Sequence, residues 1–330
     1  MTVHKPTEPV RLTTSGPADL LELVPYLLGF RPEESLVLVV IRERRVALTA
    51  RVDIPPAGAA DELLERFGQI ASSNDASALV LFAFSESRVR ISALMADLIE
   101  GLRMYSLMDA IYADGSRWWS LMCSQDCCPE DGTRYQPGTS RLAAEAVYAG
   151  LSTCSSRAEV AASVAGPPAC EQTQLRELLE AETVQVRTFS RVRRRREAVE
   201  TVDRFLARPY GLSESECARL SVLVADLEVR DAAWSMMTRA AADDHVNLWR
   251  QVVARTVSPM ESAPLCLLGM AAWISGNGAL MVCCLERMTT VDPGYTMAGL
   301  LEDINRRGLP PTAWDSLVDS MRAEIGPLVG

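Results

Sequence analysis

Two uninterrupted apolar stretches constrain the fold more than any other feature of this sequence. Residues 35–41 and 78–84 are rich in valine, leucine and phenylalanine, and each has the length of one β-strand. A strand that is apolar on both faces is stable only in a sheet that is covered on both sides, which is the arrangement of α/β proteins. We therefore expect an α/β fold for the first half of the chain.

The segments around these stretches predict a mixed sheet with flanking helices. Residues 46–54 follow the first stretch after a short charged turn and predict its hairpin partner. Residues 108–113 and 117–122 predict a second hairpin, closed at Asp114-Gly115. Amphipathic helical spacing marks connecting segments at residues 17–28, 61–71 and 91–102.

The second half of the chain is helical in period. The whole chain of 330 residues exceeds what one hydrophobic core usually serves, so we expect two domains. The predicted organisation is a tail at 1–14, an α/β domain at 15–165, a charged linker or helix at 166–212, and an all-α domain of helical hairpins at 213–330. Leu268-Gly269, Leu285 and Pro293 have the spacing of one tetratricopeptide unit of about 34 residues. Because no second copy follows at that period, we predict a repeat-like bundle.

Charge and hydropathy narrow the classes of partner. Acidic residues outnumber basic ones 43 to 33, and the resulting net charge of −10 argues against a nucleic-acid partner. The arginine-rich residues 187–196 lie among glutamates, so we expect a solvated helix face there, with an anion site as the alternative. No apolar run reaches the ~20 residues of a membrane span and no signal-peptide pattern is visible, which predicts a cytoplasmic protein without membrane attachment.

Several short motifs are spread along the chain. They are SGPADLL at 15–21, PEESLV at 32–37, ARVDIP at 50–55, DGSRWWS at 114–120 and HVNLW at 245–249. Together with the cysteines after residue 122, these motifs resemble the actinobacterial domain-of-unknown-function family 4192 (DUF4192) over nearly the whole chain. The resemblance implies an actinobacterial origin and supplies no catalytic residue, cofactor or ligand.

Three of the nine cysteines cluster at Cys123, Cys127 and Cys128. Three thiols within six positions offer sulfur ligands to a metal, and zinc is the candidate cofactor for this cluster. A fourth zinc ligand would come from Cys154, Cys170, Asp126 or His4. The alternatives are packing around a tight turn, or a reactive thiol whose pKa is lowered by nearby arginines.

Polar residues near the predicted strand ends are the candidates for ligand binding. Arg51 and Asp53 share one face of their strand, and Asp53 stands at its carboxyl end, where open α/β sheets place ligand groups. The alternative is a structural ion pair with Glu33 or Glu34, and Glu34 is itself a candidate site residue.

The second hairpin adds two further candidates, Arg117 and Trp118. Because Trp118 and Trp119 are consecutive in a predicted strand, they point to opposite faces of the sheet. One of them is therefore expected in the core, and the other against a neighbouring element or in a pocket wall.

His245 precedes Trp249 by one turn of a predicted helix, after two aspartates that suit the helix start. The two interpretations are a general base and a histidine that packs on the tryptophan. No serine or cysteine nucleophile is placed beside it by the sequence, which favours packing.

The sequence contains no Walker loop, Rossmann glycine fingerprint, zinc-protease histidine pair or Gly-x-Ser-x-Gly elbow. We therefore predict a ligand- or protein-binding module with a protein or small-molecule partner. The alternative is an enzyme of unassigned reaction, with a site between the sheet and the cysteine loop, with or without a metal. The sequence leaves the oligomeric state open.

Overall fold

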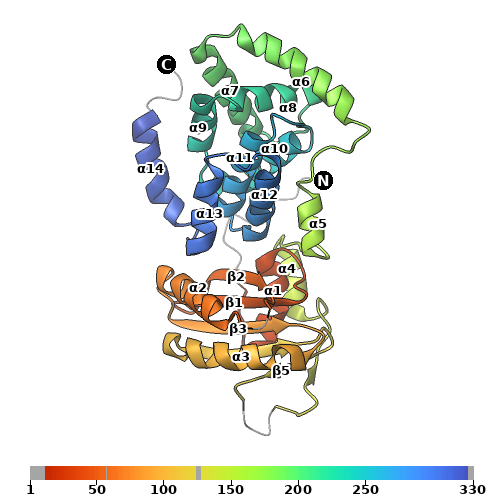
Figure 1. Ribbon diagram of the computed structural model, residues 1–330, viewed down its shortest axis with the longest axis vertical. Coiled ribbons are helices and arrows are strands. Elements are labelled where there is room, and N and C mark those ends of the chain that lie inside the picture. Colours follow the sequence, from red (N-terminus) through yellow and green to blue (C-terminus); the bar gives the residue numbers. More distant parts are fainter. Residues whose placement is uncertain (1–11, 57, 124–127, 326–330) are drawn as a thin grey trace. The chain divides into compact units, whose positions relative to one another are not determined.

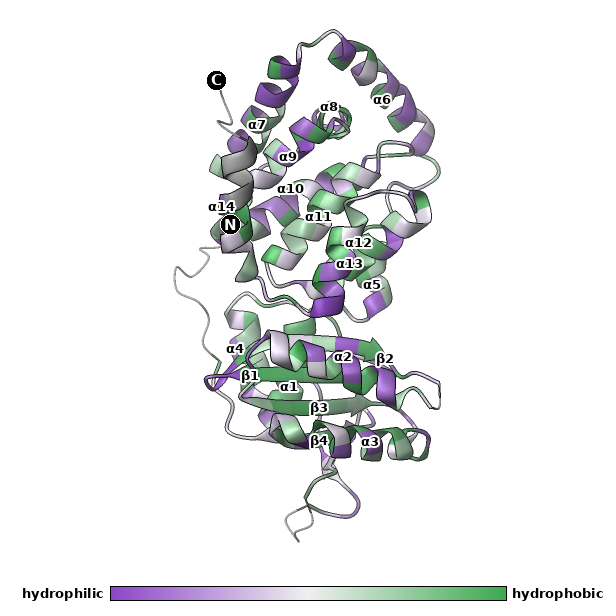
Figure 2. Cartoon of the chain, turned by 60° about the vertical axis from the view of Figure 1, so that its left-hand side comes forward, coloured by the Kyte–Doolittle hydropathy of each residue, from purple (hydrophilic) through white to green (hydrophobic). Residues whose placement is uncertain are grey.

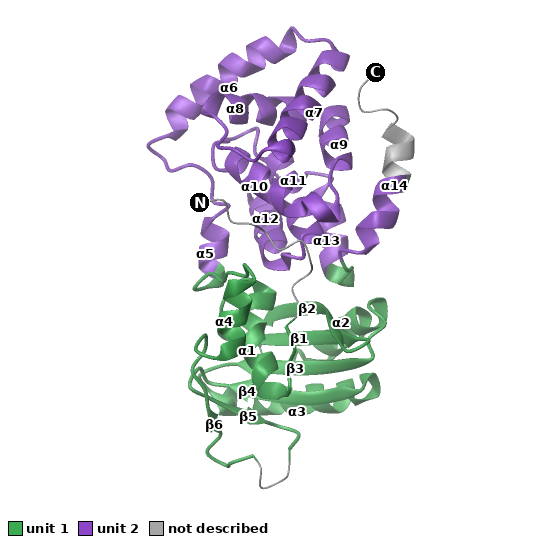
Figure 3. Ribbon diagram, turned by 180° about the vertical axis from the view of Figure 1, so that it is seen from behind, with its two compact units in different colours: residues 1–157, 306–310 green, residues 158–305, 311–330 purple. Residues whose placement is uncertain are grey.

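The computed structural model describes residues 12–56, 58–123 and 128–325, with side chains described up to residue 319. The chain divides into two compact units (Figure 3). Unit 1 contains residues 1–157 and 306–310, and unit 2 contains residues 158–305 and 311–330. Unit 1 is α/β and unit 2 is helical, which confirms the predicted fold class. Within the described ranges, no helix has both the length and the apolar character that crossing a membrane requires.

Unit 1 is built on a six-stranded mixed sheet with the order β2-β1-β3-β4-β5-β6 (Figure 1). The strands are β1 (Ser35–Arg42), β2 (Arg45–Asp53), β3 (Ala78–Phe84), β4 (Leu107–Ala113), β5 (Arg117–Ser120) and β6 (Thr133–Arg134). The helices of this unit are α1 (Pro17–Leu28), α2 (Ala60–Ser73), α3 (Arg88–Leu102), η1 (Arg103–Tyr105) and α4 (Arg141–Tyr148). Only β3 and β4 are parallel, joined by α3, and every other neighbouring pair is antiparallel. Both predicted hairpins, β1-β2 and β4-β5, are confirmed.

The sheet buries side chains on both of its faces. On one face, Leu36, Leu38 and Val40 of β1 form a core with α2 and α3. The intervening Val37 and Val39 are equally buried on the other face, where α1 lies (Figures 1 and 3). This double burial explains why β1 and β3 are continuously apolar in sequence and hydrophobic throughout in Figure 2.

Unit 2 is entirely helical in its described part. Its helices are α5 (Arg157–Ala162), α6 (Gln172–Arg187), α7 (Arg191–Ala207), α8 (Glu214–Val224), α9 (Leu227–Ser235), η2 (Arg239–Ala241), α10 (Ala242–Val253), α11 (Ser262–Ile274), α12 (Gly278–Val291), α13 (Ala298–Arg307) and α14 (Ala313–Ile325). Every residue of α11 is buried, and α8, α9, α10 and α12 pack against it. A helix that is apolar all round needs such a central position. The α11-α12 hairpin contains the tetratricopeptide-like spacing, whose assignment to that repeat stays a prediction.

The segment 166–212, expected as a charged linker or helix, forms α6 and α7 within unit 2. These helices pack against α8 and α9 through buried Leu179, Val202 and Phe205. Most of their arginines and glutamates occupy the outer faces, which are the purple parts of both helices in Figure 2, whereas Glu182 of α6 is buried. The charged outer face dominates the composition of this segment and conceals its apolar stripe in the sequence.

A short return segment, residues 306–310, belongs to unit 1 and begins with the last two residues of α13. The side-chain amide of Asn74, which is 1% exposed, donates to the carbonyl oxygens of Ile70 and Gly308, each at 2.8 Å. Gly308 has φ +58°, and a Cβ there would lie 2.8 Å from the Ile70 side chain. The return segment therefore packs on the end of α2, at a position that only glycine fits.

Candidate functional site

Unit 1 contains a pocket of about 330 Å³ at the edge of the sheet where the carboxyl ends of β3 and β4 meet. We call it the edge pocket. Its apolar wall consists of Leu21, Pro25, Pro32, Phe84, Ala113, Gly115 and Pro137, and its polar lining consists of Glu22, Arg31, Glu33, Glu34, Ser85, Glu86, Asp114 and Tyr135. Adjacent parallel strands direct their carboxyl ends and the loops that follow them toward one place, which is where α/β sheets bind ligands.

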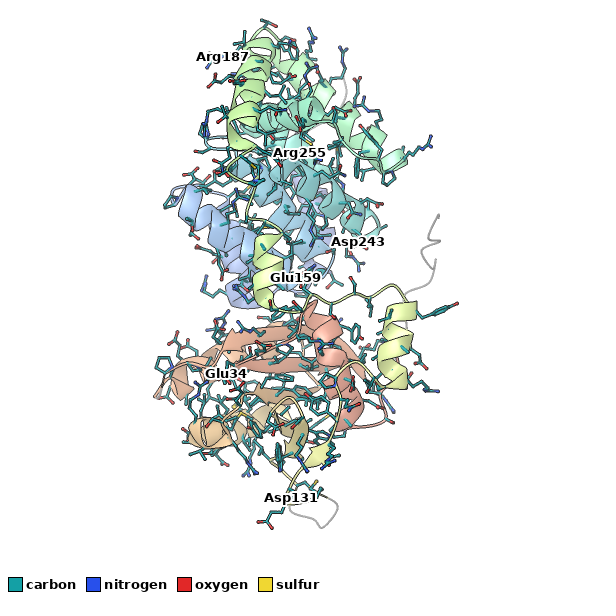
Figure 4. The ribbon with its side chains drawn as sticks, turned by 90° about the vertical axis from the view of Figure 1, so that its right-hand side faces the viewer. Glu34, Asp131, Glu159, Arg187, Asp243 and Arg255 are labelled. Atoms are coloured by element: carbon teal, nitrogen blue, oxygen red, sulfur yellow. The ribbon has the colours of Figure 1, made fainter. Side chains whose placement is uncertain are left out.

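Glu34 connects three segments at this edge. Its carboxylate accepts hydrogen bonds from the Ser85 hydroxyl at 3.1 Å and from the Glu86 backbone N–H at 2.9 Å. It also forms an ion pair with Arg90 of α3. Glu34 itself has φ +41°, an uncommon value for a residue other than glycine. The carboxylate thus holds the loop before β1 against the end of β3 (Figure 4).

Asp114 ends β4 and shapes the turn into β5. Its Oδ1 accepts hydrogen bonds from the backbone N–H groups of Ser116 at 2.8 Å and Arg117 at 2.7 Å. Burial acts to raise the pKa of the Asp114 carboxyl, but these backbone hydrogen bonds, the Ser116 hydroxyl and the Arg117 charge together hold the pKa below its ordinary value. The group is therefore a carboxylate at neutral pH.

Tyr135 follows β6 and lines the edge pocket with acidic groups from two other segments. Burial, followed by the negative charges of Glu22 and Asp114, raises the pKa of Tyr135 to about 12. Its backbone N–H donates to the Ser116 carbonyl at 3.0 Å, and the Glu22 carboxylate accepts from the Gly138 N–H at 3.1 Å. The phenol is thus neutral at physiological pH and positioned by the β4-β5 turn and α1.

Glu34 is the sequence-predicted site residue that lines the edge pocket. Arg51 and Asp53 lie at the same edge of the sheet but pair with each other at 2.6 Å. Arg51 also donates to the Ser35 hydroxyl at 2.9 Å and lies over the Phe30 ring. The partner of Arg51 is therefore Asp53 rather than the expected Glu33 or Glu34. The two side chains of β2 are close enough to pair because residues i and i+2 of a strand share a face.

Arg117 and Trp118 flank the edge pocket without lining it. The Arg117 guanidinium donates to the carbonyl oxygens of Asp131 and Gly132 at 2.9 and 3.0 Å, and so holds the loop before β6. Trp118 is half-buried in β5. Trp119 stacks on Tyr112 with ring centroids 5.2 Å apart and packs against the core with α2 and α3.

His245 lies in α10 of unit 2 and is fully buried, so the structure does not bring it to the edge pocket. Burial lowers the pKa of His245 to about 4, with the Met236 backbone opposing part of the shift. The imidazole is thus neutral at physiological pH.

The cysteine cluster is only partly within the described residues. Cys123 and Cys128 are half-buried, and Cys127 lies outside the described ranges. In the described part of the chain, no group of three or more His, Cys, Asp or Glu side chains is arranged to hold a metal ion. Zinc binding by these cysteines stays a prediction.

The arginine cluster of α7 is surrounded by acidic partners. The ion pairs are Arg191–Glu228 at 3.5 Å, Arg193–Glu197 at 3.7 Å, Arg194–Asp226 at 3.5 Å and Arg196–Glu200 at 3.7 Å. Because each of these positive charges has a nearby carboxylate, the helix face offers little net attraction for a polyanion.

The sequence interpretation missed most of the edge pocket, above all Glu22, Ser85, Asp114 and Tyr135. A signal was present for two of them, since Ser85 and Asp114 directly follow apolar strands. Glu22 appears in the sequence as the polar face of a helix, and Tyr135 as part of a loop. Their common location emerges only from the parallel pairing of β3 with β4.

Comparison with known proteins identifies the family of the chain. No curated protein and no solved structure matches the chain significantly. A family model described as "Domain of unknown function (DUF4192)" matches residues 17–312, which include all of the edge pocket and most of unit 2. The chain belongs to the DUF4192 family.

Proposed function

We propose that this protein is a small-molecule binding protein and that unit 1 holds the ligand in the edge pocket. The observation that carries the proposal is a hollow of about 330 Å³ at the carboxyl ends of two parallel strands. This volume lies in the range of small-molecule sites, and an apolar wall with a few converging polar groups is their usual lining.

The hydrogen bonds that fix the side chains of the edge pocket also favour ligand binding. Glu34 and Asp114 are fixed by backbone hydrogen bonds from Glu86, Ser116 and Arg117. Side chains held in this way lose little conformational entropy when a ligand binds, which preserves more of the interaction free energy as affinity. A partner protein for the helical unit stays a prediction from the sequence.

The proposal is tested by saturation-transfer NMR of the full-length protein with a fragment library that contains cationic, neutral and anionic members. The blocking variant is Glu86→Trp, because Glu86 is exposed at the rim and its indole replacement would fill the mouth of the pocket. The control is Glu62→Trp, an exposed position in the first turn of α2 that does not line the pocket.

We expect a subset of fragments to bind the wild type and Glu62→Trp, and to lose their signal with Glu86→Trp. The proposal is overturned if no fragment binds, or if every fragment that binds is indifferent to Glu86→Trp.

A further inference from the structure

We infer that the edge pocket selects an organic cation, that is, a compound with a primary ammonium or guanidinium group on a short carbon skeleton. This inference rests on the proposed function of the pocket and specifies the chemical class of its ligand. Three features of the lining carry it: charge, a backbone acceptor and the apolar wall.

The charge of the lining is strongly negative. Five acidic residues, Glu22, Glu33, Glu34, Glu86 and Asp114, line the pocket together with one basic residue, Arg31. Glu34 is paired with Arg90, whereas the structure gives the other four no ion pair among the described residues. A concave surface lined by one sign of charge concentrates ligands of the opposite sign. An anionic ligand would meet a net negative charge here.

An independent feature comes from the proline inside α1. Pro25 has no N–H, so the carbonyl oxygen of Leu21, four residues earlier, cannot receive the usual helical hydrogen bond from it. Both residues line the edge pocket. A main-chain acceptor without its normal donor favours a ligand that brings N–H groups, as ammonium and guanidinium do.

The remaining wall suits the carbon part of such a ligand. Phe84, Pro137 and the ring of Tyr135 contribute apolar surface to the same pocket. The charges of Glu22 and Asp114 both act on the Tyr135 hydroxyl, so both acidic groups are near the phenol. A cation held by the two carboxylates therefore lies near an aromatic ring, which adds a cation–π contribution. Glu22 and Asp114 are the central residues of the inference.

The test uses three compounds of nearly equal shape and different charge: benzylamine, benzyl alcohol and benzoate. Agmatine serves as a second cation, with both a guanidinium and an ammonium group. Isothermal titration calorimetry of the full-length protein measures each affinity at pH 7 and low salt. We expect both cations to bind more tightly than the alcohol and benzoate, and to weaken as the salt concentration rises.

Charge removal identifies the site. Asp114→Asn and Glu22→Gln keep the shape and the oxygen that accepts the backbone N–H groups, and each should weaken cation binding about tenfold. Glu62→Gln removes an equal charge outside the pocket and should change the affinity by less than about twofold.

Each alternative outcome has its own meaning. If benzyl alcohol or benzoate binds at least as tightly as benzylamine and agmatine, and Glu86→Trp abolishes that binding, cation selectivity is wrong and the proposed function stands. Cation binding that neither Asp114→Asn nor Glu22→Gln weakens overturns the inference, because the cation then binds elsewhere. If no probe and no fragment binds, both proposals fail.

Discussion

Lowering the pH should destabilise unit 2 through His245. The side chain is fully buried in α10, and its pKa falls from 6.5 to about 4 on folding. A group whose folded pKa is below its unfolded value contributes stability that is complete above the unfolded pKa and is lost as the pH falls toward the folded one. Between pH 7 and pH 5 the expected loss is about 2 kcal/mol, reaching about 3 kcal/mol at pH 4.

Urea unfolding monitored by tryptophan fluorescence measures this loss, because Trp249 is buried one turn from His245 in the same helix. Carboxylates titrate in the same range, so the decisive quantity is the difference in pH dependence between the wild type and His245→Gln. We expect the variant to lose about 2 kcal/mol less than the wild type from pH 7 to pH 5. A second variant, His245→Leu, removes the titration without leaving a buried amide. Equal pH dependence in all three proteins would refute the reasoning and mean that the folded imidazole has an ordinary pKa.

Two further predictions concern the packing of unit 2. Gly166→Ala and Gly276→Ala both introduce a side chain at φ +83°, but only the Cβ at position 166 meets a neighbour, the Arg287 guanidinium at 2.5 Å. In a urea titration, Gly276→Ala should lower the free energy of unfolding by about 1 kcal/mol. Gly166→Ala should lower it by about 1–2 kcal/mol more, because Arg287 would be displaced from Glu261. Equal losses for the two variants would contradict this. Arg219→Met removes the ion pair, 2.7 Å long, that Arg219 forms with the buried Glu182 carboxylate, and should lower the free energy of unfolding by about 2 kcal/mol. Adding Glu182→Leu in the same chain should recover part of this loss. A double-mutant cycle measures this coupling, and a value near zero would show that the pair contributes nothing.

The sequence predicts the sheet of unit 1 well because its signals are local. Residues 35–41 and 78–84 are apolar without interruption, and this pattern alone requires burial on both faces of the sheet. The β4-β5 hairpin follows from Asp114-Gly115, where Gly115 has φ +92°. In contrast, the β1-β2 turn uses Glu43 and Arg44 at positive φ. That hairpin was predicted from two strand-length segments separated by a short charged turn, without a glycine turn signal.

The candidate site was harder to predict from the sequence because it is assembled from separate segments. Glu22, Glu34, Asp114 and Tyr135 are far apart in the chain, and each has an ordinary local explanation as a helix face, a loop or a turn. The rule that ligand groups gather at the carboxyl ends of strands was applied to Asp53 in β2, an antiparallel edge strand. It applies better to β3 and β4, whose parallel pairing is a long-range property that local periodicity does not contain.

The return segment has a practical consequence for anyone who shortens this chain. A fragment that stops at residue 157 contains every strand of the sheet but lacks residues 306–310. The Asn74 amide would then lose one of its two acceptors, and Ile70 would lose the backbone that covers it. A fragment of the α/β half alone therefore needs a grafted loop in place of the missing five residues, so that Ile70 stays covered and the Asn74 amide keeps both acceptors.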